Sequence, residues 1–321
     1  MQENRSLKRK LANLGNSLGA WLIVLLMTII LSVASDNFLS QNNIVNVVRQ
    51  ISANAIIALG ASFVVLGGEI DLSTGMASTF AGCNTALLMT KLGMSMYLAI
   101  PICLVAGIVI GCFTGYIVTI LKIPAFIGSL GVQYIIQGAI QLLTNNMPIS
   151  NLPEEFLVLG RGYIFNDVVP VPALIMVVFI VIGAVVLRYT PFGRSVLSVG
   201  ENATAARLSG INVTRTKIAI FAICGFCSAA AGIVLASRMS SGQPATGADL
   251  SLQALAAVYV GGTFKGSMLN TLAGALALGL VNNGLNLMGV NPYWQKVALG
   301  IIIVLAVLFD QYRIKKSTAR K

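Results

Sequence analysis

Long stretches that are almost free of charged residues recur along this chain and limit what it can fold into. A transmembrane helix needs about 20 mostly apolar residues, and ten stretches meet or approach that length. They are Leu18–Ser35, Gln50–Gly68, Leu72–Thr90, Leu92–Leu121, Ile123–Leu143, Val168–Leu187, Ile218–Ser237, Leu250–Phe264, Gly266–Gly289 and Tyr293–Phe309. The pattern predicts an all-α polytopic membrane protein with about ten transmembrane helices. Leu250–Phe264 is short enough to be a half-helix or a re-entrant segment.

The composition excludes soluble and disordered proteins. Of the 321 residues, 56% are hydrophobic and 10% are charged, whereas soluble domains carry about 25% charged residues and disordered segments combine low hydrophobicity with high charge. The chain has no histidine, which excludes Ser-His-Asp triads, Cys-His pairs and histidine-ligated metal sites. The apolar stretches also lack paired acidic residues. We therefore expect no catalytic residue, no metal and no cofactor on this chain.

The distribution of basic residues predicts the orientation in the membrane. Cytoplasmic segments of membrane proteins carry an excess of Lys and Arg. With a cytoplasmic N-terminus and ten crossings, 16 of the 21 Lys and Arg residues lie inside and five lie outside. Both basic tails then lie in the cytoplasm, which requires an even number of crossings. Topology thus explains the net charge of +11 without nucleic-acid binding.

The same assignment gives the domain organisation. We expect a cytoplasmic N-terminal tail (residues 1–17), one transmembrane domain (18–310) and a basic cytoplasmic C-terminal tail (311–321). The longest cytoplasmic loop of the transmembrane domain covers residues 188–217.

A few polar residues are expected at membrane depth. Amides there either hydrogen-bond to neighbouring helices or line a water-filled cavity, and the sequence leaves both interpretations open. Three of the asparagines fall close to one face of a single helix, which makes them the better cavity candidates. The candidate residues of a path for a polar solute are Asn54, Asp71, Asn282, Asn283 and Asn286.

Small residues predict close helix packing. Gly107, Gly111 and Gly115 repeat at a spacing of four residues, which leaves a strip without side chains along one helix face. Such strips let two helix backbones approach closely. We expect this one to serve packing rather than chemistry.

Two polar breaks share the triplet Asp-Leu-Ser. The first, Gly67–Ser73, separates the second and third apolar stretches, and the second, Gly247–Ser251, separates the seventh and eighth. On the topology above they face opposite sides of the membrane, as in an inverted repeat that relates spans 2–5 to spans 7–10. Asp71 and Asp249 would then start corresponding helices near opposite faces. Alternatively, each aspartate merely caps the helix that follows it.

The cytoplasmic loop predicts a short helix. Asn202 is a favourable N-cap, residues 203–209 favour helix, and Gly210 suits the residue that follows a helix end. A helix of about two turns is not stable alone in water. We therefore expect it to bind a cytoplasmic partner, with the small side chains of Ala205 and Ala206 facing that partner.

The motif around this helix resembles a known family. Gly200-x-Asn202-x-x-Ala205-Ala206-x-x-x-Gly210-Ile211 is similar to the cytoplasmic coupling motif of ribose-type sugar ABC transporter permeases. Further motifs agree in family order over nearly the whole chain. They are Asn37-Phe38, Gly68-x-Ile70-Asp71-Leu72-Ser73, Pro124-Ala125-Phe126-Ile127, Gly261-Gly262-Thr263 and Asn283-Gly284-Leu285-Asn286-Leu287-x-Gly289-Val290. After Thr263 the relatives usually continue with a longer glycine-rich stretch, which is shortened here.

The resemblance implies an importer-type permease in a bacterial inner membrane, embedded in lipid. It also implies three protein partners: a separate ABC ATPase, an extracytoplasmic sugar-binding protein and a second permease copy, in a homodimer. The residues that it implies for coupling to the ATPase are Gly200, Glu201, Asn202, Ala205, Ala206, Arg207, Gly210 and Ile211.

The energy source follows from a missing motif. The chain contains no Gly-x-x-x-x-Gly-Lys-Ser/Thr loop for nucleotide phosphates. ATP and magnesium are therefore expected on the partner ATPase, and the imported solute is expected to be a neutral sugar. The alternative is an ion-coupled secondary transporter of a small polar solute. It would need membrane carboxylates, for which Glu69 and Asp71 are the candidates.

The predicted orientation can be tested by labelling single cysteines in a cysteine-free variant. A cysteine at Ser150 should react with a membrane-impermeant thiol reagent added outside intact cells. Cysteines at Ser198 and Ser317 should react only after the membrane is opened, because the charge distribution places both positions in the cytoplasm. Labelling of Ser198 and Ser317 from outside would contradict the topology.

Overall fold

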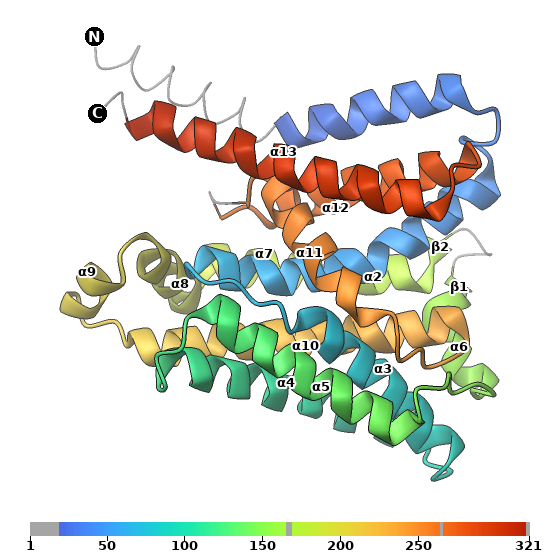
Figure 1. The fold of residues 1–321 in the computed structure, drawn as a ribbon, viewed down its shortest axis with the longest axis horizontal. Coiled ribbons are helices and arrows are strands. Elements are labelled where there is room, and N and C mark those ends of the chain that lie inside the picture. Colours follow the sequence, from blue (N-terminus) through green and yellow to red (C-terminus); the bar gives the residue numbers. More distant parts are fainter. Residues whose placement is uncertain (1–18, 165–168, 264–265, 319–321) are drawn as a thin grey trace.

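The computed structural model describes residues 19–164, 169–263 and 266–318, almost all of them in α-helices. Most helices run lengthwise through the molecule (Figure 1). Helices α8 (Pro191–Glu201) and α9 (Ala203–Leu208) lie at one end. Helix α6 (Glu154–Arg161) and a small antiparallel pair, β1 (Tyr163–Ile164) and β2 (Val169–Pro170), lie at the other end. The predicted N-terminal tail, residues 1–17, falls outside the described residues, as do Phe264 and Lys265.

Each of the ten apolar stretches corresponds to a helix. In chain order these are the helix Gly19–Ala34, α2 (Gln41–Leu66), α3 (Thr74–Thr90), α4 (Met96–Thr119), α5 (Ala125–Thr144), α7 (Val171–Tyr189), α10 (Val213–Met239), α11 (Gly247–Gly261), α12 (Met268–Leu287) and α13 (Pro292–Thr318). Helix α13 includes most of the predicted C-terminal tail. The all-α architecture is thereby confirmed.

Six of the described helices are long and apolar enough to cross a membrane: α2, α4, α5, α7, α10 and α12. The chain is therefore a polytopic membrane protein. Helices α3 and α11 have 17 and 15 residues, which is short of the roughly 20 needed to cross a bilayer. The stretch Leu72–Thr90 therefore produces a helix shorter than a full span, whereas Leu250–Phe264 is expected to be short from its sequence.

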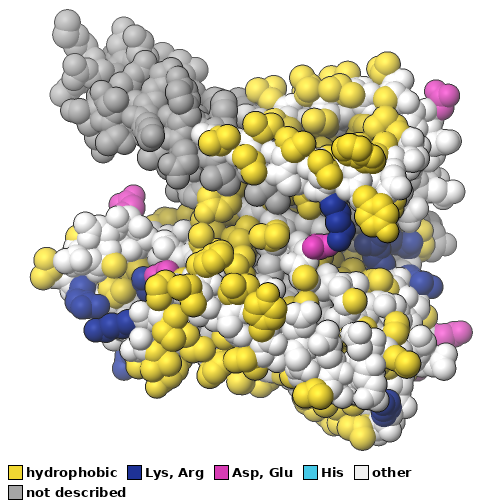
Figure 2. Space-filling view, viewed as in Figure 1, with side chains coloured by type: hydrophobic (Ala, Val, Ile, Leu, Met, Phe, Trp, Pro, Cys, Tyr) yellow, Lys and Arg dark blue, Asp and Glu magenta, His cyan; other side chains and the backbone are white. Residues whose placement is uncertain are grey.

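The central and the outer helices of the bundle differ in how much of their apolar surface is buried. Helices α2, α10 and α12 bury 78%, 67% and 67% of their most apolar window, and α2 packs against α7, α10, α11 and α12. Helices α4, α5 and α7 bury less than a third of theirs. Figure 2 shows hydrophobic side chains spread over the visible face. So much exposed apolar surface is typical of a protein that faces lipid.

The glycine strip packs α4 against α10, as predicted. A Cβ atom on Gly107 would lie 2.6 Å from the carbonyl oxygen of Gly225, and one on Gly111 would lie 2.2 Å from that of Phe221. Gly115 faces Ile218 in the same way: a Cβ added to Gly115 would lie 3.0 Å from the Cα of Ile218. The two backbones therefore touch along the strip.

The placement of the two polar breaks corrects one expectation. Residues 67–73 run as non-helical chain from the α8 end of the bundle toward its interior, where α3 begins (Figure 1). Helix α11 begins against it: a Cβ on Gly75 would lie 2.0 Å from the carbonyl oxygen of Gly247. The expectation that Asp71 and Asp249 start helices near opposite faces is wrong, because the first turns of both short helices meet in the interior.

The α4–α10 contact leads to a prediction on stability. Gly111→Ala should destabilise the protein by about 1–3 kcal/mol, because overpacked side chains force the backbones apart. Gly131→Ala is the matched control. Gly131 lies in α5 with nothing within 4 Å of an added Cβ, and the exchange should stabilise the helix by roughly 0.5–1 kcal/mol. Thermal unfolding in detergent compares the two, and equal melting temperatures would contradict close α4–α10 packing.

Candidate functional site

A cavity of about 460 Å³ lies between α2, α11, α12 and α13. A single water occupies about 30 Å³ of liquid, so the cavity can hold a solute of several heavy atoms. Its walls are formed by Gln50, Asp249, Leu252, Gln253, Asn282, Asn286, Pro292, Gln295, Lys296, Leu299 and Gly300.

Side-chain amides dominate the polar part of this wall. Five of the lining residues are Gln or Asn, contributed by all four helices: Gln50, Gln253, Asn282, Asn286 and Gln295. An amide both donates and accepts hydrogen bonds, as hydroxyl groups do. The wall is therefore suited to a neutral solute rich in hydroxyl groups.

One ion pair borders the cavity. Lys296 Nζ of α13 lies 2.9 Å from Asp249 Oδ2 of α11, with 70% and 57% of the two side chains exposed. An exposed pair of this kind contributes little to stability. Since the two charges neutralise each other, the wall carries no net charge.

Two of the sequence candidates line this cavity and a third supports it. Asn282 and Asn286 are lining residues. Asn54 of α2 donates a hydrogen bond of 3.1 Å from Nδ2 to Oε1 of Gln253, a lining residue of α11. Asn54 thereby holds the Gln253 amide in place.

The other two candidates have different surroundings. Asn283 is 7% exposed and forms a reciprocal amide pair with Asn43 of α2, with N–O distances of 2.8 and 3.1 Å. It joins α12 to α2 and does not line the cavity. Asp71 is buried, and its carboxylate accepts hydrogen bonds from the backbone and the hydroxyl of Ser73. For these two residues the structure shows local packing contacts.

The motif in the loop that covers residues 188–217 folds as its sequence predicts. Oδ1 of Asn202 accepts hydrogen bonds from the backbone N–H groups of Thr204 and Ala205, 3.0 and 2.9 Å away, and caps α9. Gly210 follows the helix end with φ of +85°, a conformation that glycine adopts without strain. Both ends of this short helix are therefore confirmed.

The orientation of α9 differs from the prediction. Ala206 is 4% exposed and packs against Val199 and Val213. The expectation that it faces a partner is wrong, because the one buried face of this short helix is used by the chain itself. Ala205 is exposed, as predicted, and Leu208 is 85% exposed.

The remaining coupling candidates are either half-buried or exposed. Gly200 and Ile211 are half-buried, and Ile211 packs beside Ala206. The exposed members are Glu201, Asn202, Arg207 and Gly210.

Sequence reasoning missed the glutamines and the ion pair of the cavity wall. Gln253 is the one amide in the otherwise apolar and small residues of α11 after Ser251, and this isolation was an available signal. Gln295 lies in the first turn of α13, where polar residues are common, and Gln50 stands at the start of the second apolar stretch. Only tertiary structure brings them to the same cavity.

The molecule thus combines apolar helices with a polar cavity that carries no net charge. This combination is suited to a membrane protein that admits a small polar solute. A family model described as "Branched-chain amino acid transport system / permease component" matches residues 43–307. The chain belongs to this family of permease components and is a transport protein rather than an enzyme.

Several curated relatives cover most of the chain. It is 38% identical over 301 residues to the ribose import permease protein RbsC of Haemophilus influenzae, with 91% of this chain and 92% of the relative covered. It is 40% identical to RbsC of Bacillus subtilis, with 92% of each covered. The L-arabinose transport system permease protein AraH of Escherichia coli is 34% identical, with 92% and 91% covered. No solved structure matches.

The two neighbouring asparagines of α12 should behave differently when replaced. Asn283→Ala leaves the Asn43 amide without its partner and should cost about 1–3 kcal/mol of stability. Asn282→Ala should leave the melting temperature unchanged and lower transport, because Asn282 lines the cavity. Thermal unfolding and solute uptake by the same two variants test this, and the reverse outcome would contradict the assigned roles.

Proposed function

We propose that this chain is the permease subunit of an ATP-driven importer for a monosaccharide such as ribose. The observation that carries the proposal is the amide-lined cavity without net charge between α2, α11, α12 and α13, in a chain 38–40% identical to ribose import permeases. A sugar offers only hydroxyl and ring oxygen atoms, which side-chain amides can bind from all sides. ATP would be hydrolysed on a separate subunit, and alternating access would move the sugar along the cavity.

The proposal includes an orientation. The end of the bundle with α8 and α9 would face the cytoplasm, and the end with α6 would face outward, in a bacterial inner membrane. Figure 2 shows Lys and Arg side chains both at the α8–α9 end and toward the α6 end. The orientation rests on the sequence, in which 16 basic residues are assigned to the inside and five to the outside. Ten crossings or re-entrant segments would leave both termini in the cytoplasm.

The importer-type fold would include an inverted repeat that relates α2–α5 to α10–α13. The chain enters the interior from opposite ends before the two short helices: residues 67–73 come from the α8 end, and residues 240–246 come from the α6 end (Figure 1). Discontinuous helices that meet inside the bundle are typical of transporters with inverted repeats.

The exposed face of α9 would bind the ATPase. It presents Ala205 and Leu208, and Leu208, which is 85% exposed, would supply an apolar contact with the partner. Glu201 and Arg207 lie exposed beside this face and would supply polar contacts at its rim.

An arginine cluster at the opposite end would bind the sugar-binding protein. Arg49 Nη2 donates to the Arg161 carbonyl oxygen at 2.5 Å, and Arg161 Nε donates to that of Arg238 at 2.9 Å. The Arg49 guanidinium also lies 4.4 Å from the centre of the Tyr163 ring. None of the three forms an ion pair within the described residues. Such a cluster favours an acidic partner.

A second copy of this chain would complete a dimeric path.

Reconstitution tests the proposed function. The chain would be purified with its ATPase and sugar-binding protein and placed in proteoliposomes, and uptake of radiolabelled ribose would be measured. We expect uptake that requires ATP and the binding protein, with L-arabinose as a second test sugar. Uptake driven by an ion gradient without ATP would contradict the proposal and favour the secondary transporter.

The two faces of α9 give a prediction on coupling. Leu208→Glu should lower co-purification of the ATPase at least tenfold and leave the melting temperature of the chain unchanged, because the side chain contacts little of its own subunit. Ala206→Glu should instead lower the melting temperature, since it places a charge among Val199 and Val213. Normal ATPase binding by Leu208→Glu would contradict the assignment of this face.

A further inference from the structure

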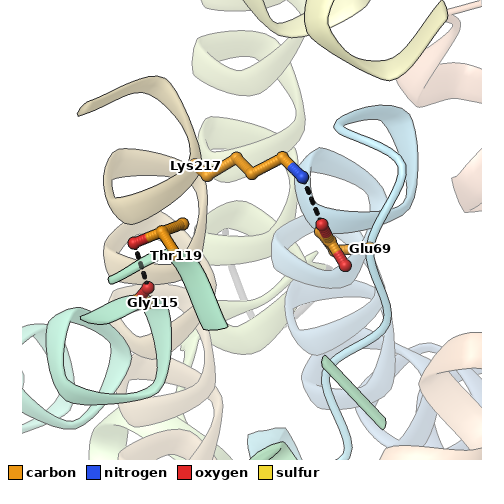
Figure 3. Close-up of polar contacts among 4 residues, drawn as sticks. All are labelled: Glu69, Gly115, Thr119 and Lys217. Atoms are coloured by element: carbon orange, nitrogen blue, oxygen red, sulfur yellow. Dashed lines mark hydrogen bonds and ion pairs between the residues drawn. The ribbon is translucent and has the colours of Figure 1, made fainter. Parts of the chain in front are cut away.

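The non-helical segment 67–73 is held at the α8 end by an ion pair. Lys217, near the start of α10, pairs with the carboxylate of Glu69 (Figure 3). The two side chains are 20% and 18% exposed, so that water and salt screen their attraction less than at the surface. Thr119 of α4, beside the pair in Figure 3, donates its hydroxyl to the Gly115 carbonyl of its own helix, 2.6 Å away. It therefore does not share the pair.

Helix α8 holds the same segment from the other side. A Cβ on Gly200 would lie 1.8 Å from the carbonyl oxygen of Leu66, so the backbones of α8 and the end of α2 are in direct contact. Gly68 adopts φ of +81° against Gly200. The chain thus turns out of α2 directly on the surface of α8.

Helix α9 contacts both α8 and α10. Its Ala206 packs between Val199 of α8 and Val213 of α10. Asn212 caps α10 through a 2.9 Å hydrogen bond from the backbone N–H of Arg215. A displacement of α9 would therefore act on the first turns of α10, which carry Lys217.

The far end of the segment is joined to α11. The Ser251 hydroxyl donates a 2.6 Å hydrogen bond to the Leu72 carbonyl and accepts a 2.8 Å hydrogen bond from the Gly75 N–H. Ser251 is 1% exposed. The same helix α11 carries Asp249 and Gln253 of the cavity wall. A shift of residues 67–73 along their length is thereby passed to the cavity.

We propose that Glu69 and Lys217 are positioning residues that transmit movement of α9 to the cavity through residues 67–73 and Ser251. This inference rests on the proposed function, in which α9 binds the ATPase. The backbone contact of α8 with Leu66 and Gly68 involves no charge, whereas the ion pair between Glu69 and Lys217 resists separation of its charges. The pair therefore fixes the segment to α10 while the ATPase moves the loop.

Charge reversal and charge exchange test the role of the pair. Glu69→Lys and Lys217→Glu would each be purified with the ATPase and the binding protein, and sugar imported per ATP hydrolysed would be measured in proteoliposomes. We expect each variant to lower this ratio at least fivefold while the ATPase stays bound. The exchanged variant Glu69→Lys/Lys217→Glu should recover at least half of the wild-type ratio, because it restores opposite charges.

Lys122→Glu is the matched control. Lys122 is exposed in the α4–α5 turn and forms no ion pair among the described residues, so this reversal should keep the wild-type ratio. Should a reversed variant fail to accumulate, Glu69→Gln removes the pair without placing two like charges together, and we expect it to lower the ratio at least threefold. A merely structural role would lower the yield of protein but not the ratio.

The outcomes separate this inference from the proposed function. Wild-type protein that imports no sugar with ATP contradicts the proposed function. Wild-type import together with a normal ratio in Glu69→Gln or both reversed variants contradicts the inference alone. An exchanged variant that is purified in normal yield but keeps the low ratio of the single variants also contradicts it.

Discussion

The first turns of α3 and α11 touch backbone to backbone inside the bundle, and the arrangement of the surrounding helices depends on this contact. It requires residues without side chains at Gly75 and Gly247, because a Cβ on Gly75 would lie 2.0 Å from the facing carbonyl oxygen. Ser251 fixes the crossing through its two hydrogen bonds. Since both helices begin in the interior, each must be preceded by chain that is not helical. Non-helical backbone is tolerated at membrane depth only where protein or a cavity surrounds it.

This constraint connects the two functional regions of the molecule. Residues 67–73 form the non-helical chain before α3, and they lie against α8 and α10 at one end and α11 at the other. Helix α11 in turn forms one wall of the amide-lined cavity. The surface proposed for the ATPase and the cavity proposed for the sugar would therefore communicate through one short segment. Apolar outer helices such as α4 and α5 provide the surface toward lipid.

Much of the fold could be predicted from sequence, because lipid imposes a simple rule on each helix. The ten apolar stretches, the glycine strip of α4 and the caps at Asn202 and Gly210 all depend on local sequence. The half-helix alternative for Leu250–Phe264 agrees with α11, which has 15 residues. The interior start of α3 could not be predicted, since a polar break looks the same at a membrane surface and in a packed interior. Asn282 and Asn283 are chemically identical neighbours, and only the presence of Asn43 distinguishes them. Ala206 faces inward because Val199 and Val213 lie beneath it, which a two-turn helix cannot reveal by its periodicity.

The central claim is that the cavity between α2, α11, α12 and α13 is part of a path that ATP opens and closes. The most direct measurement is the reactivity of a cysteine at Asn286, a lining residue, toward a membrane-impermeant thiol reagent. The experiment uses a cysteine-free variant in complex with the ATPase. We expect labelling from the extracytoplasmic side without nucleotide, and a change in the labelling rate of at least tenfold when ATP and the sugar-loaded binding protein are added. A cysteine that is inaccessible from both sides, or whose reactivity is the same with and without ATP, would contradict the claim.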